Sequence, residues 1–312
     1  MKTKVCLLFG GDSMEREISF LSYKEIMGNI DKDKFDVISI EVPVEKNNSW
    51  VQKLISYSPD VVMIAMHGGK GEDGSVQGLL ESLDTPYIGS KVLSSAISMD
   101  KDICKALLKA NNIPVIDWVC INKNDKLVFF EGTLNEIGYP LFVKPNTGGG
   151  SIGVSPVNSY EELGPAAAAA FQYSSEIIVE KFIKGKEVAC AIIQNNSGID
   201  ALNILDIDSG VGFYDFTSKY IDTKKFIDFS ALPLYQKKMV KEIGKKAFKT
   251  LKCRGIAVVD MIISEEQVYV LEVNTLPGFT SKSIIPKSVS NIKEFKNFLT
   301  ELIEFEIGQG GF

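Results

Sequence analysis

The first third of the chain alternates short apolar runs with a longer segment in which apolar and polar residues mix. The runs KVCLLFGG (4–11), FDVISIEV (35–42) and DVVMIAMHGG (60–69) predict buried strands, and EREISFLSYKEIMGNI (15–30) predicts a helix between the first two. Strands that alternate with helices indicate a parallel sheet with crossover helices, which is an α/β fold. Such sheets bind ligands in the loops at the carboxyl ends of their strands.

The middle third contains a helix pattern followed by a glycine-rich stretch. SMDKDICKALLKANNIP (98–114) predicts a helix that ends before a proline, with Ile103, Ala106, Leu107 and Ala110 on one face. KPNTGGGSIGV (144–154) lies between two apolar runs that read as strands. Its lysine precedes the glycines, whereas the lysine of a P-loop follows them. We therefore predict a mobile flap over a ligand, and not the start of a helix.

The last third contains a long irregular stretch and then regular elements. GVGFYDFTSKYIDTKKFIDF (210–229) has little pattern, and an irregular segment of this length inside a domain is usually functional or disordered. YQKKMVKEIGKKAFKTLK (235–252) predicts a helix with Met239, Ile243, Ala247 and Leu251 on one face. The final run, 255–280, reads as two strands joined by a polar turn.

Those last two strands bring three oxygen-bearing side chains together. Glu272 and Asn274 are two residues apart on one strand and share a face, while Asp260 lies on the partner strand. Oxygen ligands are those that Mg²⁺ prefers, and substrate phosphates usually complete its shell. A solvated strand face is the alternative, but the surrounding VYVLEVN is apolar and reads as buried. A buried carboxylate needs a cation, so the pattern favours a metal site.

Composition excludes several classes of function. A length of 312 residues predicts two or three domains, and 45% hydrophobic with 24% charged residues is typical of a soluble globular protein. The net charge of −6 gives no reason to expect nucleic acid or an anionic membrane as partner. No apolar run approaches the ~18 residues of a membrane span, and the N-terminal run is too short for a signal peptide. The five cysteines are scattered, which favours a reducing cytoplasm.

Several single residues have a structural and a functional interpretation side by side. Glu15 follows Asp12 at a helix start, where it either completes a capping box or holds an ammonium group at the end of a strand. His67, the single histidine, is either structural or part of a binding loop with Glu72 and Asp73, and it argues against a histidine-rich metal site. The same choice applies to two possible phosphate-binding lysines, two strand-end carboxylates and a loop glycine: Lys101, Lys144, Glu180, Glu187 and Gly278.

Eight motifs, in order, resemble the D-alanine–D-alanine ligases of the ATP-grasp superfamily. They are GGDSMEREIS, HGGKGEDGSVQGLLE, YIGSKVLSSAISMDK, KPNTGGGSIGV, EKFIKGKEV, FYDFTSKY, CRGIAVVD and LEVNTLPGFT. The resemblance implies an ATP-grasp fold with an N-terminal parallel-sheet domain (1–97), a central lobe carrying the flap (98–184) and a C-terminal lobe with the metal site and mobile loop (185–312). It also implies a cytoplasmic homodimer that acts on small amino acids for peptidoglycan precursor synthesis.

The resemblance assigns roles to individual residues. The flap, including Ser151, covers the ATP phosphates, and the metal triad holds two Mg²⁺ ions, with Mn²⁺ as a possible substitute. Glu15 binds the ammonium group of the first amino acid, and Gly278 supplies a backbone N–H. Lys101 and Lys144 contact the phosphates. The adenine and ribose pocket is lined by Glu180, Lys181, Ile183 and Glu187. The substrates are enclosed by His67, Lys219, Tyr220 and Ser283.

The implied reaction has two steps. The carboxylate of the first D-alanine attacks the γ-phosphate of ATP, giving an acyl phosphate and ADP. The amine of the second D-alanine then attacks the acyl carbon, and phosphate leaves. Positioning and charge neutralisation do most of the work, and the flap must exclude water. Family members that make an ester with D-lactate carry histidine where this chain has Tyr220, so amide formation is favoured.

Two positions depart from the family pattern. The family usually has RGxxRxD before the metal aspartate, but Val258 stands at the second arginine, and losing an oxyanion donor typically costs about 10²–10³ in rate. Gly150 stands where the flap usually has serine. The chain therefore makes D-Ala-D-Ala, joins a different pair such as D-Ala-D-Ser, or binds ATP without ligating. A nicotinamide dehydrogenase is disfavoured because G-x-G-x-x-G is absent.

Overall fold

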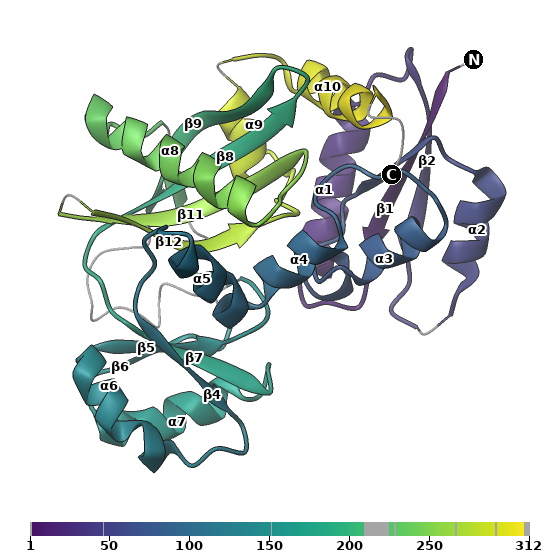
Figure 1. Ribbon diagram of the computed structural model, residues 1–312. Coiled ribbons are helices and arrows are strands. Elements are labelled where there is room, and N and C mark those ends of the chain that lie inside the picture. Colours follow the sequence, from purple (N-terminus) through teal and green to yellow (C-terminus); the bar gives the residue numbers. More distant parts are fainter. Residues whose placement is uncertain are drawn as a thin grey trace.

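The computed structural model describes residues 2–45, 47–150, 152–208, 225–227, 229–265, 267–290 and 292–308. Figure 1 shows three sheets, each with its own covering helices. The first is a parallel sheet of order β2-β1-β3, as predicted. Its strands and helices are β1 (Thr3–Gly10), α1 (Arg16–Asn29), β2 (Phe35–Val42), α2 (Ser49–Tyr57), β3 (Val61–Ile64), η1 (Gly69–Gly71) and α3 (Ser75–Ser82).

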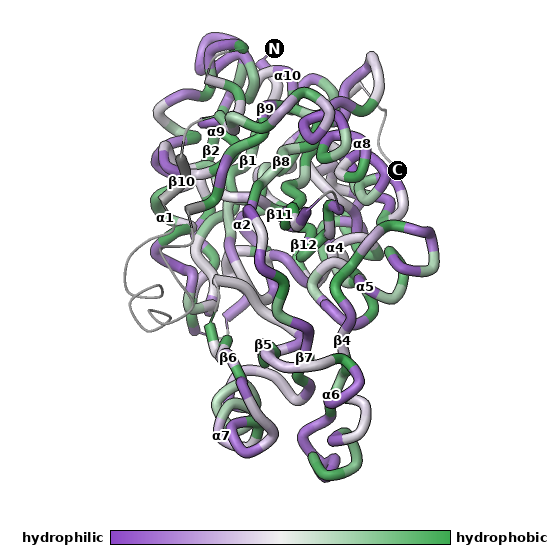
Figure 2. Tube along the Cα trace, turned by 90° about the vertical axis from the view of Figure 1, so that its left-hand side faces the viewer, coloured by the Kyte–Doolittle hydropathy of each residue, from purple (hydrophilic) through white to green (hydrophobic). Residues whose placement is uncertain are grey.

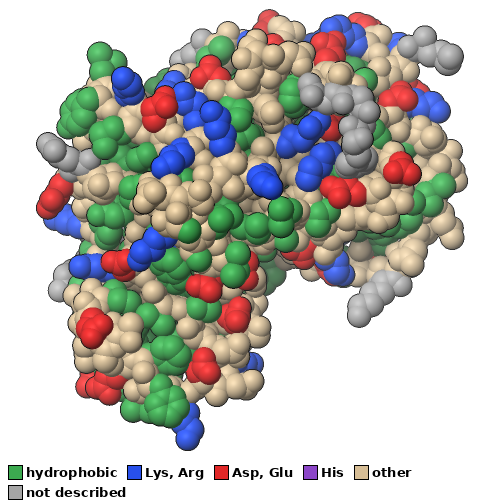
Figure 3. Space-filling view, in the orientation of Figure 1, with side chains coloured by type: hydrophobic (Ala, Val, Ile, Leu, Met, Phe, Trp, Pro, Cys, Tyr) green, Lys and Arg blue, Asp and Glu red, His purple; other side chains and the backbone are tan. Residues whose placement is uncertain are grey.

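The second sheet is a small antiparallel one of order β4-β7-β5-β6. Two helices, α4 (Val92–Met99) and α5 (Lys101–Ala110), lead into it from the first sheet. Figure 3 shows this part projecting below the rest of the molecule, with an open notch beside it. Its elements are β4 (Trp118–Asn122), η2 (Leu127–Phe130), α6 (Glu131–Ile137), β5 (Leu141–Pro145), β6 (Ser155–Val157), α7 (Tyr160–Ala170) and β7 (Glu176–Lys181).

The third sheet is antiparallel, of order β10-β9-β8-β11-β12. Helix α8 packs on one face, and α9 and α10 pack on the other, where their apolar residues join those of the first sheet in one core. In Figure 2 hydrophobic segments gather on the inner strands, including β1 and β8. The elements are β8 (Lys186–Asn195), β9 (Gly198–Asp208), β10 (Lys225–Ile227), α8 (Leu234–Thr250), β11 (Ile256–Ser264), β12 (Gln267–Asn274), α9 (Ile284–Val289) and α10 (Phe295–Gly308).

Helix α5 is turned differently from what its apolar pattern suggests. Ile103 is 50% exposed and Ala106 is also exposed, whereas Lys105 is 1% exposed. The inward face consists of Lys101, Cys104, Lys105 and Leu108. The lysines can lie inward because this face of the helix packs beside the buried carboxylate of Glu180, whose negative charge offsets the cost of burying their positive charge.

Helix α8 shows a smaller shift of the same kind. Its most buried residues are Val240, Gly244, Ala247 and Phe248, while Met239 and Ile243 are only partly buried. The buried stripe therefore lies about one residue further along the helix than predicted. The long irregular stretch was predicted to carry a functional loop, and its residues 209–224 lie outside the described part of the chain.

Candidate active site

The predicted metal triad lies at the end of the third sheet. Asp260 on β11 is directly opposite Glu272 on β12, and Asn274 is opposite Val258. All three polar residues are partly buried, and most of the positions next to them on the two strands are buried. The side-chain oxygen of Asn274 accepts a hydrogen bond from Leu276 N–H at 2.9 Å, which orients the amide. Two carboxylates and an amide at this spacing match the donor set of a hard cation such as Mg²⁺.

Val258 is 2% exposed and belongs to the apolar core that joins the first and third sheets. It lies two residues before Asp260 on β11, so the two residues share a face of the strand. A valine here contributes neither a charge nor a hydrogen-bond donor.

A buried ionic cluster connects α5 to the second sheet. Glu180 on β7 is 5% exposed, and its two carboxylate oxygens contact Lys144 Nζ at 2.5 Å and Lys105 Nζ at 3.0 Å. Burial alone would raise the pKa of Glu180, but Lys105 and Lys144 together hold it at about 2. The alternative that Glu180 is a solvated strand-end charge is therefore wrong.

Lys101 is the third lysine in this region. Its ammonium donates to the backbone carbonyl of Gly148 at 2.6 Å, which ties the start of α5 to the flap. Burial lowers the pKa of Lys101, while Glu272 on the metal hairpin acts in the opposite direction. Neither Lys101 nor Lys144 is therefore an ordinary surface lysine. Lys101 contacts the flap through Gly148 and interacts electrostatically with Glu272 of the predicted metal site.

The other predicted nucleotide-pocket residues lie at the connection from β7 to β8. Lys181 is exposed at the end of β7, and Ile183 and Glu187 are partly buried on either side of the turn. The turn is packed closely on β11, since a Cβ at Gly185 would lie 2.4 Å from the carbonyl oxygen of Ile263. These residues therefore border the junction between the second and third sheets.

The flap contacts Glu15, which is more than 100 residues away in the sequence. A Cβ at Gly149 would lie 3.5 Å from one carboxylate oxygen of Glu15, and a Cβ at Gly150 would lie 3.6 Å from the other. Glu15 does not complete a capping box, because the helix begins after it and Asp12 pairs with Lys70 at 3.1 Å. Burial raises the pKa of Glu15, and the nearby Glu72 adds to that rise.

His67 is held in place from two sides. Its Nε2 is 2.8 Å from Ser22 Oγ, and its Nδ1 is 3.6 Å from a Glu72 carboxylate oxygen. Ser22 in turn accepts a hydrogen bond from the backbone N–H of Phe279 at 3.2 Å. This chain of contacts joins α1, the loop after β3 and the loop after β12, where Gly278 lies.

Gly278 and Ser283 are close neighbours in that last loop. A Cβ at Gly278 would lie 2.7 Å from Ser283 Oγ and 4.0 Å from His67 Cε1, so this position has little room for a side chain. The Ser283 hydroxyl also lies 2.8 Å from that of Thr280. Three further predicted site residues, Ser151, Lys219 and Tyr220, lie outside the described residues.

Lys105 and Ser22 belong to the site but were not predicted from the sequence. The signal for Lys105 was its spacing, because Lys101 and Lys105 are one helical turn apart and must share a face. A glutamate directly after the apolar run IIV in the strand EIIVEK was the matching signal for a buried partner. Ser22 carries no comparable signal, since a serine in a helix gives no indication of what it contacts.

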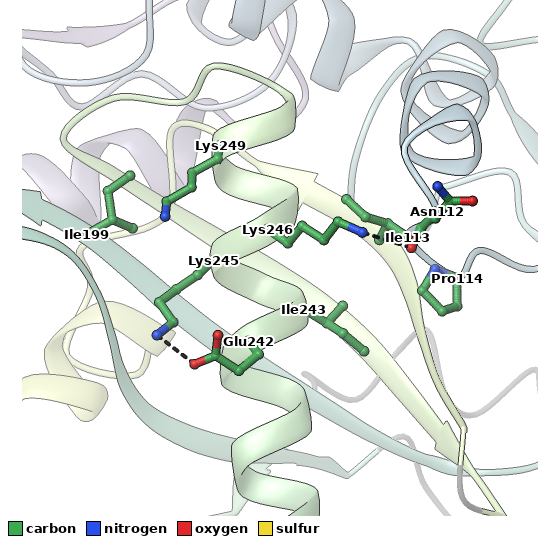
Figure 4. A pocket seen from close by; sticks show the side chains of 9 residues that line it. All are labelled: Asn112, Ile113, Pro114, Ile199, Glu242, Ile243, Lys245, Lys246 and Lys249. Carbon is green, nitrogen blue, oxygen red and sulfur yellow. Dashed lines mark hydrogen bonds and ion pairs between the residues drawn. The ribbon is translucent and has the colours of Figure 1, made fainter.

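A groove on the described surface lies elsewhere. It has a volume of about 450 Å³ and is lined by α8 and the turn after α5 (Figure 4). Three of its charged side chains are already engaged, because Lys245 pairs with Glu242 at 2.7 Å and Lys246 donates to the carbonyl of Asn112 at 3.0 Å. None of the predicted site residues lines it, so it is not the candidate site.

The geometry described above defines an ATP-grasp ligase, with a glycine flap, buried lysines and a carboxylate hairpin between two antiparallel sheets. Family models confirm this class: the D-ala D-ala ligase N-terminus matches residues 4–59 and 48–90, and the D-ala D-ala ligase C-terminus matches residues 107–304. The chain belongs to the D-alanine–D-alanine ligase family.

Individual relatives agree with the family models. The chain is 41% identical to a D-alanine–D-alanine ligase of Clostridium beijerinckii, with 92% of both sequences covered. It superposes on the D-alanine–D-alanine ligase of Bacillus anthracis complexed with ATP with a TM-score of 0.85 and 35% identity, covering 98% of each chain. The VanG D-Ala:D-Ser ligase of Enterococcus faecalis is similar at a TM-score of 0.84 and 31% identity, covering 98% of this chain and all of that one.

Proposed function

We propose that this protein joins two D-alanines into D-alanyl-D-alanine, with ATP as the energy source, for peptidoglycan precursor synthesis. The observation that carries the proposal is the contact of the flap with both ends of the site. Gly148 accepts from Lys101, and Gly149 and Gly150 adjoin Glu15. A phosphate-binding loop and a carboxylate suited to an ammonium group thus meet at one place, as a reaction between ATP and an amino acid requires.

The nucleotide lies between the central part (98–184) and the C-terminal part (185–312), and the N-terminal part (1–97) supplies the amino-acid site. Lys101 and Lys144 neutralise phosphate charge, and the β7–β8 connection lines the purine and ribose. On the family resemblance, Ser151 acts at the phosphates, and Lys219 and Tyr220 act at the substrates. The family resemblance supports a homodimer in the cytoplasm. Within the described residues no helix is long and apolar enough to cross a membrane.

Asp260, Glu272 and Asn274 hold Mg²⁺. The opposed register of the two carboxylates, in a partly buried setting, fits a divalent cation, because a cation offsets the repulsion between two negative charges held close together. The metal supplies positive charge at the phosphates when bound. Glu15 orients the first D-alanine through its ammonium group. His67, Ser283 and the backbone N–H of Gly278 line the side of the site where its carboxyl group lies.

The test is phosphate release from Mg·ATP with D-alanine, followed by single D- and L-amino acids and their pairs, with the products identified by mass spectrometry. Formation of D-Ala-D-Ala as the main product supports the proposal. Reaction with only another pair, such as D-alanine with D-serine, refutes this choice of substrates. ATP binding without phosphate release in any mixture refutes the ligase assignment.

A further inference from the structure

Lys105 is the most deeply buried lysine of the cluster around Glu180. It is 1% exposed, compared with 9% for Lys101, and its ammonium lies 3.0 Å from Glu180 Oε2. The ring of Trp118, on the neighbouring strand β4, lies 5.3 Å from the same ammonium. No role in the reaction has been assigned to Lys105 so far, and its charge is enclosed by α5 and the second sheet.

The cluster contains more positive than negative charge. Lys105 and Lys144 share one carboxylate, so Glu180 cannot neutralise both. Burial lowers the pKa of Lys105, with Glu180 opposing that effect. Lys144, with 13% of its side chain exposed, is the more accessible of the two lysines. An anion that enters the site can therefore contact Lys144, whereas Lys105 is separated from it by the carboxylate of Glu180.

We propose that Lys105 is a positioning residue that keeps Glu180 ionised and correctly oriented, and so leaves Lys144 available to the phosphates of the nucleotide. This inference rests on the proposed function, which places ATP at the cluster. If Lys105 carried no charge, Lys144 and Glu180 would form a one-to-one buried pair. The nucleotide would then have to break that pair before Lys144 could bind phosphate.

The orientation of Glu180 also bears on the choice of purine. In the proposed function Glu180 lines the purine pocket, where an ionised carboxylate accepts hydrogen bonds and cannot donate, so it favours the 6-amino group of adenine over the 6-oxo group of hypoxanthine. Lys105 occupies one carboxylate oxygen and fixes the plane of the group. Its loss is expected to weaken the preference for ATP over ITP in addition to weakening binding.

The experiment measures equilibrium dissociation constants for Mg·ATP and Mg·ITP by calorimetry, and KM and kcat for ligation, in Lys105→Met. Lys109→Met is the matched control. Lys109 lies one turn further along α5 and 5.4 Å from the same Trp118 ring, but it pairs with the exposed Asp117 at 2.9 Å. We expect Lys105→Met to raise the dissociation constant for ATP about tenfold or more and to reduce the ATP-to-ITP preference, with the KM for D-alanine unchanged.

Two further variants separate positioning from folding. Lys105→Arg retains a cation and is expected to keep more of the ATP affinity and purine preference than Lys105→Met. In a Glu180→Gln background, Lys105→Met should have little additional effect on the preference, because the two residues act as one unit. The arginine variant also provides a readout if the methionine variant does not fold.

The proposal is overturned if Lys105→Met binds both nucleotides as the wild type does. It is equally overturned if Lys105→Met weakens ATP binding by the same factor in the wild-type and the Glu180→Gln backgrounds, since Lys105 then does not act through Glu180. A wild-type protein that binds ATP but forms no dipeptide refutes the proposed function and leaves the test of Lys105 intact. A wild-type protein that binds no nucleotide refutes both.

Discussion

Glu306, on the last helix, is expected to be a major contributor to stability. Its carboxylate is 3% exposed and accepts from Arg254 Nε at 3.0 Å and Nη2 at 3.2 Å, while Lys91 Nζ lies 3.3 Å away. These contacts join α10 to the segments before α4 and β11. Removing one partner of a buried ion pair costs about 3–5 kcal/mol when the other charge is left buried.

The expected cost for Glu306→Ala is somewhat lower than that range. The Arg254 and Lys91 side chains are 26% and 28% exposed, so water can solvate part of the charge that is left unpaired. We expect a loss of about 2–3 kcal/mol, and a fall in melting temperature of about 5–10 °C. Urea unfolding followed by circular dichroism measures the free energy, and differential scanning calorimetry measures the melting temperature.

Glu304→Ala is the control for this prediction. Glu304 lies on the same helix and pairs with Lys34 at 3.1 Å, but both side chains are more than half exposed. An exposed pair contributes about 0–1 kcal/mol, so this variant should differ little from the wild type. If the two variants lose equal stability, burial does not determine what these pairs contribute, and the reasoning is wrong.

Three other variants test the site and the packing around it. Glu15→Gln should raise the KM for D-alanine and change the KM for ATP little. Because the pKa of Glu15 is raised, the wild-type KM for D-alanine should increase as the pH falls, beginning at a higher pH than an ordinary carboxyl group would give. This pH dependence should be absent in the variant. Asp260→Asn should reduce Mg²⁺-dependent phosphate release about 100-fold or more, and recovery of the rate at high Mg²⁺ would indicate weakened metal binding. Gly185→Ala should lower the melting temperature, because its Cβ would lie 2.4 Å from a carbonyl oxygen, whereas Gly132→Ala, with no atom within 4 Å of its Cβ, should not.

Much of the fold follows from local patterns in the sequence. The alternation of apolar runs and helices in the first third correctly predicts the parallel sheet, because its strands are connected by crossovers; β1 and β3 are largely buried, whereas β2 at the edge is partly exposed. The opposition of Asp260 and Glu272 follows from the two-residue period of strands and a short turn. In contrast, contacts such as that of Ser22 with His67 join segments far apart in the chain, and no local pattern encodes them.

The failures of local prediction are concentrated around the candidate site, and there is a physical reason for this. A helix normally buries its apolar stripe, but α5 turns Lys101 and Lys105 inward because the free energy of burying them is recovered from Glu180 and the flap. Val258 is the opposite case: an apolar residue on the same strand face as Asp260 is buried in the core and brings no charge to that face. If the proposed function holds, the positive charge at the nucleotide comes mainly from Lys101, Lys105 and Lys144, and their arrangement determines how strongly the nucleotide binds.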